Sequence, residues 1–190
     1  MEGNSMIDKL RNDEELAEIF ARNFEVEIKE QDEMPEDEFG HLKYNINGVA
    51  FAGDGAGGQY ILLEDGSIGF WGSEGKVGRI ADSIEEFFEF VVNCPFWYEY
   101  CQKKYYTDIT QLSIRSKEIL EELAKDMSEH DEDLYAKQKY AAGRMGITLY
   151  EDVANDVLMR FYHSTTRSPQ FYGEYTEDDG SKHIVDGLLW

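Results

Sequence analysis

Glycine is concentrated in one short part of this chain, because ten of the seventeen glycines lie between residues 48 and 78. Glycine inside a helix costs about 1 kcal/mol relative to alanine, so this stretch disfavours a helix. Apolar runs alternate with the glycines, and Asp65-Gly66 and Glu74-Gly75 stand where tight turns would join neighbouring strands. Such a density of glycine is typical of sharply curved antiparallel strands with bulges. We therefore expect a twisted, mainly antiparallel sheet.

The hydrophobic pattern indicates where the strands lie. Alternation of apolar and charged residues predicts a half-buried strand over residues 24–28, and apolar-rich runs predict strands over 46–52, 60–63, 68–71 and 77–80. Asp65-Gly66 predicts a type I′ hairpin turn, which needs a left-handed backbone at both central residues. Glu74-Gly75 predicts the next turn along the chain.

Helical periodicity flanks this sheet on both sides. Residues 6–22 show apolar residues near a period of 3.6, which predicts one amphipathic helix. Ser83 and Glu86 form a capping box for a helix that should end at Cys94-Pro95 and face the sheet with an apolar stripe. The aromatic run 96–100 should then pack as a short element over one edge.

Beyond about residue 108 the chain is mostly helical. The expected helices are one marked by Leu112 to Met127, one starting at Asp131-Glu132-Asp133, and one opened by a second capping box at Thr148 and Glu151 and closed by Pro169. The residues around Asp179-Gly180 predict a terminal hairpin.

Together these patterns predict an α+β fold. We expect a twisted, mainly antiparallel sheet of about four to six strands packed by helices, with a helical C-terminal extension. In this division residues 1–107 form the α+β core. Residues 108–190 form the extension, which ends in the hairpin and packs on the core.

Charge restricts the class of partner. The chain has 40 Asp and Glu against 18 Lys and Arg, a formal net charge of −22. Nucleic acid and anionic membranes repel such a surface, so we expect neither as a partner, whereas a basic protein is attracted. No apolar run approaches the ~20 residues of a membrane helix. The acidic N-terminal segment does not resemble a secretory signal, so the expected location is the cytoplasm.

No motif indicates a catalytic, metal or cofactor site. Residues 53–58 satisfy G-x-G-x-x-G, but a strand pattern follows instead of the helix that would hold a pyrophosphate. Cys94 and Cys101 are the only cysteines and the four histidines are dispersed, so we expect reduced structural thiols and no metal. No nucleophile, base and orienting group can be assembled from neighbours in sequence. We expect a protein that is not an enzyme, while an enzyme whose site forms only in three dimensions stays open.

One region resembles a known family. The segments that carry the resemblance are Met34-Pro35-Glu36-Asp37, Phe39, Leu42, Asn47-Gly48, residues 51–55, 60–62, 65–68 and 80–87. In this order they are similar to the SUKH superfamily, which is named for a yeast regulator of cell-wall synthesis and includes many bacterial immunity proteins. The resemblance covers about a third of the chain. Met34 stands where the family has leucine, Gly40 interrupts a segment that should be helical, and residues 108–190 extend beyond the shared part.

The resemblance implies a protein without enzymatic activity that binds and neutralises a cognate toxin, often a nuclease. The net charge agrees with this independently, because carboxylates attract a basic nuclease domain and accelerate association. The candidate contacts are Asp54, Asp65 and Glu74, with Trp71 as an anchor. We expect a monomer or weak homodimer. The alternative is a scaffold or regulatory protein that binds a cellular partner.

Overall fold

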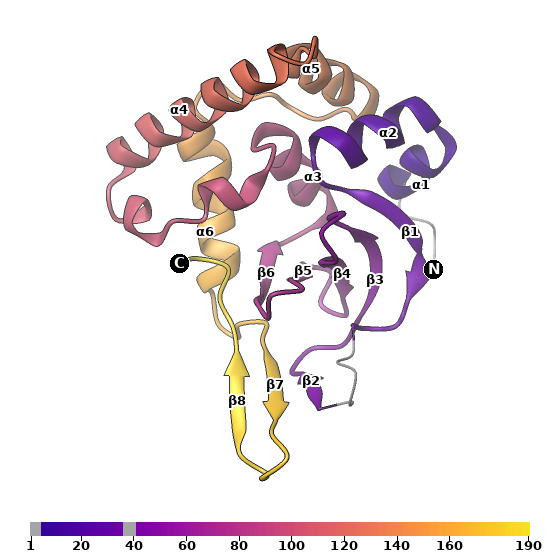
Figure 1. The fold of residues 1–190 in the computed structure, drawn as a ribbon, viewed down its shortest axis with the longest axis vertical. Helices are drawn as coiled ribbons and strands as arrows, with labels where there is room; N and C mark the ends of the chain where they lie inside the picture. Colours follow the sequence, from indigo (N-terminus) through magenta and orange to yellow (C-terminus); the bar gives the residue numbers. More distant parts are fainter. Residues whose placement is uncertain (1–4, 36–40) are drawn as a thin grey trace.

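The computed structural model describes residues 5–35 and 41–190 and has the predicted α+β architecture (Figure 1). Phe39 and Gly40, with Glu36 and Asp37 of the family resemblance, lie outside the described residues. The main sheet is antiparallel, with five strands in the order β1-β3-β4-β5-β6, and a second sheet has the order β2-β7-β8. The strands are β1 Glu27–Asp32, β2 Leu42–Tyr44, β3 Gly48–Gly53, β4 Gln59–Leu63, β5 Ile68–Trp71, β6 Val77–Ala81, β7 Gly173–Thr176 and β8 Lys182–Val185.

The helices lie mainly above the main sheet in Figure 1. They are α1 Ser5–Asn12, α2 Glu14–Asn23, α3 Ile84–Asn93, α4 Ile109–Ser128, α5 Leu134–Met145 and α6 Met159–Thr166, with short turns η1 Trp97–Tyr100, η2 Lys103–Thr107 and the π-helical η3 Ala154–Leu158. None of the helices in residues 5–35 and 41–190 is both long and apolar enough to cross a membrane.

The prediction of one helix over residues 6–22 is wrong, because Asp13 divides it into α1 and α2. The backbone of Asp13 is extended, and its carboxylate accepts a hydrogen bond from the N–H of Leu16. An aspartate in this position caps the start of a new helix. The apolar period continues across the break, so it conceals the cap.

The predicted start of the helix after residue 148 is also wrong. The helical segment that includes η3 and α6 begins after Asp152, whose carboxylate accepts from the N–H of Asn155 at 3.2 Å, and not at the expected box of Thr148 and Glu151. The carbonyl of Thr148 instead accepts from the side chain of Asn93 at 2.9 Å, which ties this segment to the end of α3. A tertiary contact therefore takes the place of the predicted cap.

The two turns that flank β5 have the same backbone geometry. The N–H of Gly66 donates to the carbonyl of Leu63, and the N–H of Gly75 donates to that of Gly72, both at 2.9 Å. Gly66 and Gly75 both have φ of +84°, while Asp65 is not left-handed. A type I′ turn needs two left-handed residues, so the predicted turn type is wrong. Each of the two connections instead has a single left-handed residue, its glycine, as in hairpin loops of more than two residues.

The main core lies between this sheet and the helices. The predicted stripe of α3, consisting of Ile84, Phe87, Phe88 and Val91, is buried as expected. Trp97 is also buried, and its indole N–H donates to the hydroxyl of Tyr60 at 2.9 Å. Cys94 and Cys101 are free thiols in this core, and burial raises the pKa of both. Leu112 and Ile119 of α4 and Phe161 of α6 belong to the same cluster, so the C-terminal helices share the core of the sheet.

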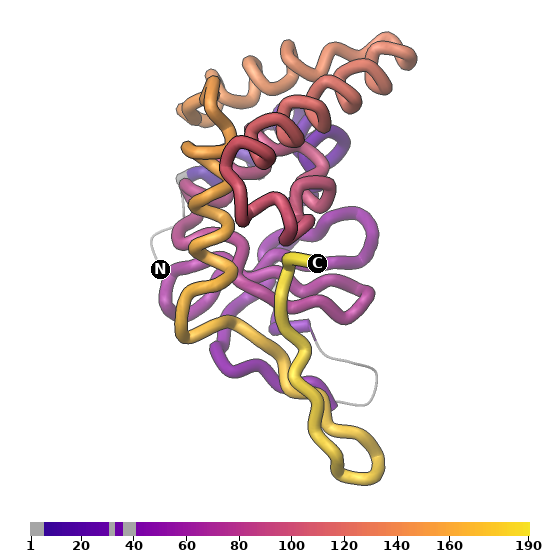
Figure 2. Tube along the Cα trace, turned by 90° about the vertical axis from the view of Figure 1, so that its left-hand side faces the viewer, coloured from indigo at the N-terminus to yellow at the C-terminus, as the bar shows by residue number. Residues whose placement is uncertain are grey.

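The opposite face of the sheet covers a smaller cluster of Ile61, Leu63, Val77 and Phe171. Next to it lies the second sheet, in which β2 pairs with β7 and β7 pairs with β8. The β7–β8 hairpin extends away from the body of the molecule in both views (Figures 1 and 2).

After β8, residues 186–190 return to the main sheet. A side chain on Gly78 would collide with Leu188, because a Cβ there would stand 2.6 Å from the Leu188 Cγ. The backbone of Trp190 accepts from the N–H of Lys103 at 2.7 Å and donates to the carbonyl of Cys101 at 3.0 Å. These contacts fix Trp190 beside the segment that follows η1.

Candidate functional site

A groove of about 410 Å³ lies at one end of the main sheet. Two connections form it, because the loop between β3 and β4 and the turn between β5 and β6 emerge at the same end, where Gln59 pairs with Trp71. Segments near residue 98 and at the end of the chain complete its walls. We call it the end groove, and it is lined by Asp54, Ala56, Gly72, Ser73, Glu74, Lys76, Tyr98 and Trp190.

The glycine-rich loop holds Asp54 in a fixed position. One carboxylate oxygen of Asp54 accepts from the N–H of Ala56 at 2.8 Å and from that of Gly58 at 2.7 Å. A Cβ on Gly58 would stand 2.5 Å from the other Asp54 oxygen and 2.6 Å from Phe70, so glycine is needed for this close approach. The loop leads into β4 and not into a helix, so it lacks the helix end that would bind a dinucleotide phosphate.

Two aromatic rings, those of Tyr98 and Trp190, form part of the wall of the end groove. Tyr98 stacks on Trp97 with ring centres 4.1 Å apart, and its ring lies 6.1 Å from that of Trp190. Burial raises the pKa of the Tyr98 hydroxyl above its usual value, and the charges of Asp54 and Glu74 add to this shift. Tyr98 is therefore a neutral ring beside negative charge.

The end groove already holds one cationic group from its own chain. The ammonium of Lys76 lies 3.8 Å from the centre of the Trp190 ring, a cation–π contact. Among the described residues, no carboxylate lies within 4.0 Å of the Lys76 ammonium as an ion-pair partner. Residue Trp190 is 48% exposed, and its ring is thus a platform on which an ammonium rests.

Glu25 adds a strained acidic group near this end of the sheet. Its φ is +54°, a left-handed backbone that non-glycine residues rarely adopt. Burial raises the pKa of Glu25 to about 7, and the charges of Asp54 and Glu99 contribute. Near neutral pH this group is therefore partly protonated, and it couples electrostatically to Asp54.

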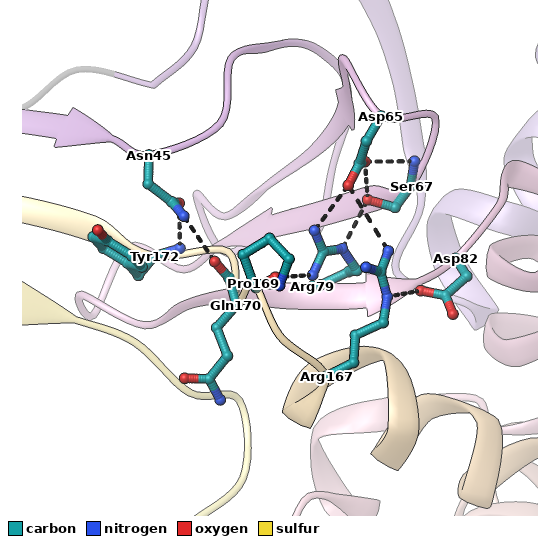
Figure 3. A network of polar contacts seen from close by, with 9 residues as sticks. All are labelled: Asn45, Asp65, Ser67, Arg79, Asp82, Arg167, Pro169, Gln170 and Tyr172. Atoms are coloured by element: carbon teal, nitrogen blue, oxygen red, sulfur yellow. Dashed lines mark hydrogen bonds and ion pairs between the residues drawn. The ribbon is translucent and has the colours of Figure 1, made fainter.

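Asp65 lies at the other end of the sheet and is already engaged (Figure 3). Arg79 is fully buried, and its guanidinium donates to Asp65 at 2.9 Å, to the hydroxyl of Ser67 at 2.8 Å and to the carbonyl of Pro169 at 2.9 Å. Arg167 approaches Asp65 at 3.8 Å. Partial burial alone would raise the pKa of Asp65, but the hydrogen bonds from Ser67 and the charge of Arg79 outweigh it and lower the pKa.

The same network connects the sheet to the segment that enters the second sheet. Arg167 also pairs with Asp82 at 2.8 Å. The side chain of Asn45 donates to the carbonyl of Gln170 at 2.8 Å and accepts from the N–H of Tyr172 at 2.9 Å, as Figure 3 shows. Asp65 thus helps to position residues 167–172.

The structure therefore separates the four predicted contact residues. Asp54 and Glu74 line one groove, whereas Asp65 belongs to the network at the opposite end of the sheet. Trp71 is half-buried and packs against the smaller cluster, on the face away from Phe70 in the main core. Sequence reasoning did not place Glu25, Tyr98 or Trp190 beside the end groove, and it expected Tyr98 in a short element packed over one edge of the sheet. No local signal places them there, because the three residues come from distant parts of the chain.

The chemistry of the end groove suits binding of a cation. Its carboxylates attract positive charge, and its aromatic wall accepts an alkyl chain or a guanidinium plane. Both thiols are buried in the core, and neither lines the groove. Among the described residues, no three His, Cys, Asp or Glu side chains are placed to hold a metal ion together.

No family model, curated protein or solved structure matches this chain.

Proposed function

We propose that this chain is an immunity protein that binds and neutralises a cognate basic toxin, a nuclease domain, through its acidic surface, with the end groove at the centre of the contact. One observation carries the proposal. The groove combines two carboxylates, Asp54 and Glu74, with an aromatic platform on which an ammonium already rests. A lysine or arginine of a basic partner would find the same surroundings there.

The net charge of −22 supports the same partner class. A nuclease grips phosphate with cationic side chains, so an acidic protein competes with the substrate for the same groups. Complementary charge accelerates encounter by roughly 10–10³-fold at low salt. The resemblance to the SUKH superfamily supports this function as well, and it includes parts of β3 to β6, which belong to the sheet that bears the groove.

The test is rescue of growth and a measured affinity. A search of the neighbouring reading frames for a basic nuclease domain supplies the probe, and an unrelated basic ribonuclease is the specificity control. Co-expression of the wild-type chain should restore growth against the first and leave the second unaffected. The affinity should fall as salt rises, because screening weakens the charge attraction.

Two matched double variants separate the end groove from overall charge. Asp54→Asn with Glu74→Gln removes two charges from the groove, and the asparagine oxygen can still accept the two loop N–H groups. Asp126→Asn with Glu129→Gln removes two charges from exposed positions near the end of α4. We expect about 10- to 100-fold weaker binding for the first pair and less than about 3-fold for the second. Equal losses would contradict a role of the groove, and absence of rescue together with a growth defect in the deletion strain without toxin would favour the scaffold alternative.

A further inference from the structure

The exposed edges of the two sheets are protected to different degrees. In β1 the pairing register shifts between Ile28 and Asp32, and the guanidinium of Arg11 donates to the carbonyl of Lys29 at 3.3 Å. On the other side of the main sheet, α6 packs against β6. Bulges, bound side chains and covering helices are the devices that keep foreign strands from pairing with an edge.

Among the described residues, β8 has no register shift and no covering helix, and its protection is limited to its short length and the charge of Lys182. It pairs with β7 alone, over four residues and without a shift of register. Lys182, His183 and Ile184 are exposed, and Ile184, at 53%, is the most exposed large hydrophobic residue in the part of the chain that the structure describes. Because the hairpin projects from the body, no helix stands beside this edge in either view (Figures 1 and 2).

The register shows which main-chain groups face outward. The N–H of Thr176 donates to the carbonyl of His41 at 3.1 Å, so the polar groups of Thr176 face the β2 side of β7. Thr176 is opposite Lys182, and in an antiparallel pair such a residue has its own groups turned away from the shared ladder. By the two-residue period of a strand, Lys182 and Ile184 both present their N–H and C=O at the free edge.

The charge of the hairpin selects the kind of strand that can bind. Residues 173–186 contain five acidic residues and one lysine, a net charge of −4 with histidine neutral. The ammonium of that lysine, Lys182, is already paired with Glu174 at 2.6 Å. A second copy of the chain would bring the same negative charge to this edge, whereas a basic segment would bring the opposite charge.

We propose that the free edge of β8 binds an extended basic segment of the protein partner as an added strand, with Lys182 and Ile184 supplying the main-chain hydrogen bonds. This inference rests on the proposed function and gives the partner a second contact region, separate from the end groove. Main-chain bonds supply affinity in this mode of recognition. The apolar side chain of Ile184 and the surrounding carboxylates favour alternating apolar and basic residues in the bound segment.

The test uses the full chain and a peptide, acetyl-Lys-Val-Lys-Val-Lys-Val-Lys-amide. Its control is the same peptide methylated on every backbone nitrogen, which keeps the charge and removes the donors. Amide hydrogen exchange by NMR should show that saturating peptide slows exchange at Lys182 and Ile184 by roughly tenfold or more. The methylated peptide should leave both rates unchanged.

Variants of the chain test the same bonds from the other side. Ile184→Pro removes one outward N–H, a substitution that an edge strand tolerates, and Ile184→Ala removes only the side chain. We expect about tenfold weaker peptide binding for proline and less than about threefold for alanine. Exchange at His183 reports whether the hairpin persists in the proline variant. If the hairpin does not persist, the comparison of the plain and the methylated peptide on the wild-type chain still tests whether main-chain hydrogen bonds hold the peptide.

Three results would overturn the inference. Equal losses for proline and alanine would assign binding to the side chain. Protection of Lys182 and Ile184 that rises with protein concentration and needs no peptide would assign the edge to a second copy. Peptide-induced changes confined to residues around Asp54 and Glu74 would assign the partner to the end groove alone, and would leave the proposed function standing. Rescue experiments that fail while the peptide still protects β8 would overturn the proposed function instead.

Discussion

The two ends of the main sheet carry acidic turns with opposite roles. At one end Asp65 is bonded to the buried Arg79. At the other end Glu74 lies in a turn of the same backbone geometry and lines an open groove. The same turn shape therefore presents either a counter-ion for the interior or a charge for a partner. The difference comes from the buried guanidinium of Arg79, which pairs with Asp65, and not from the type of acidic residue or the shape of its turn.

The largest expected effect comes from removing Asp65, the counter-ion of Arg79. Asp65→Ala leaves the buried guanidinium of Arg79 without its counter-ion, so we expect a loss of about 3 kcal/mol in the free energy of unfolding. Glu74→Ala, the matched change in the other turn, should cost less than about 0.5 kcal/mol. Urea unfolding of both variants measures the two values. Similar losses would show that the two turns do not differ in this way.

A second prediction uses pH, because the carboxyls at the two ends shift in opposite directions. The pKa of Glu25 is raised to about 7, so folding favours its protonated form. Its contribution to stability is present below about pH 4 and is lost as pH rises through 7. The pKa of Asp65 is lowered, so its contribution is present above about pH 4 and is lost on further acidification.

Glu25→Gln removes the penalty of ionising Glu25 in the folded protein. The variant should therefore gain about 2 kcal/mol relative to wild type between pH 5 and pH 8, measured by urea unfolding across this range. Glu121→Gln, at an exposed position of α4, is the control for the loss of one negative charge. A difference between Glu25→Gln and wild type that does not change with pH would contradict the raised pKa.

The smallest expected effect concerns Lys76, the cation of the end groove. Lys76→Met removes the ammonium that rests on Trp190, so a cation of the partner no longer competes with it. We expect about threefold tighter binding of the nuclease domain, the size of one exposed cation–π contact. Lys104→Met is the control, since its ammonium lies over Tyr105, outside the groove lining. Surface plasmon resonance at fixed salt distinguishes the two, and an equal gain in both variants would indicate a general charge effect.

Much of the fold could be predicted because its signals are local. The strands and turns around residues 48–81 follow from glycine and apolar alternation, and α3 follows from the cap at Ser83, whose hydroxyl accepts from the N–H of Glu86. Local signals failed where the chain makes a distant contact. Strand β2 has only three residues, too few for their alternation to indicate a strand, and it pairs with β7 about 130 positions later.

The candidate site was partly predictable for the same reason. Asp54 and Glu74 stand in connections that a hairpin sheet brings to one end, so their proximity follows once the strands are known. The role of Asp65 depends on Arg79, which lies across a hairpin and would be expected to be exposed from its residue type alone. Tyr98 and Trp190 reach the groove through tertiary packing, which no spacing in the sequence indicates.

The burial of the two thiols has a practical consequence for all of these measurements. Cys94 and Cys101 are inaccessible and carry raised pKa values, so a thiol reagent can modify them only after the protein opens. The carbonyl of Cys101 accepts from the backbone of Trp190, whereas Cys94 follows α3 in the core. Labelling of Cys101 ahead of Cys94 would time the release of the C-terminal segment from the body, and simultaneous labelling would time global unfolding, without any substitution in the chain.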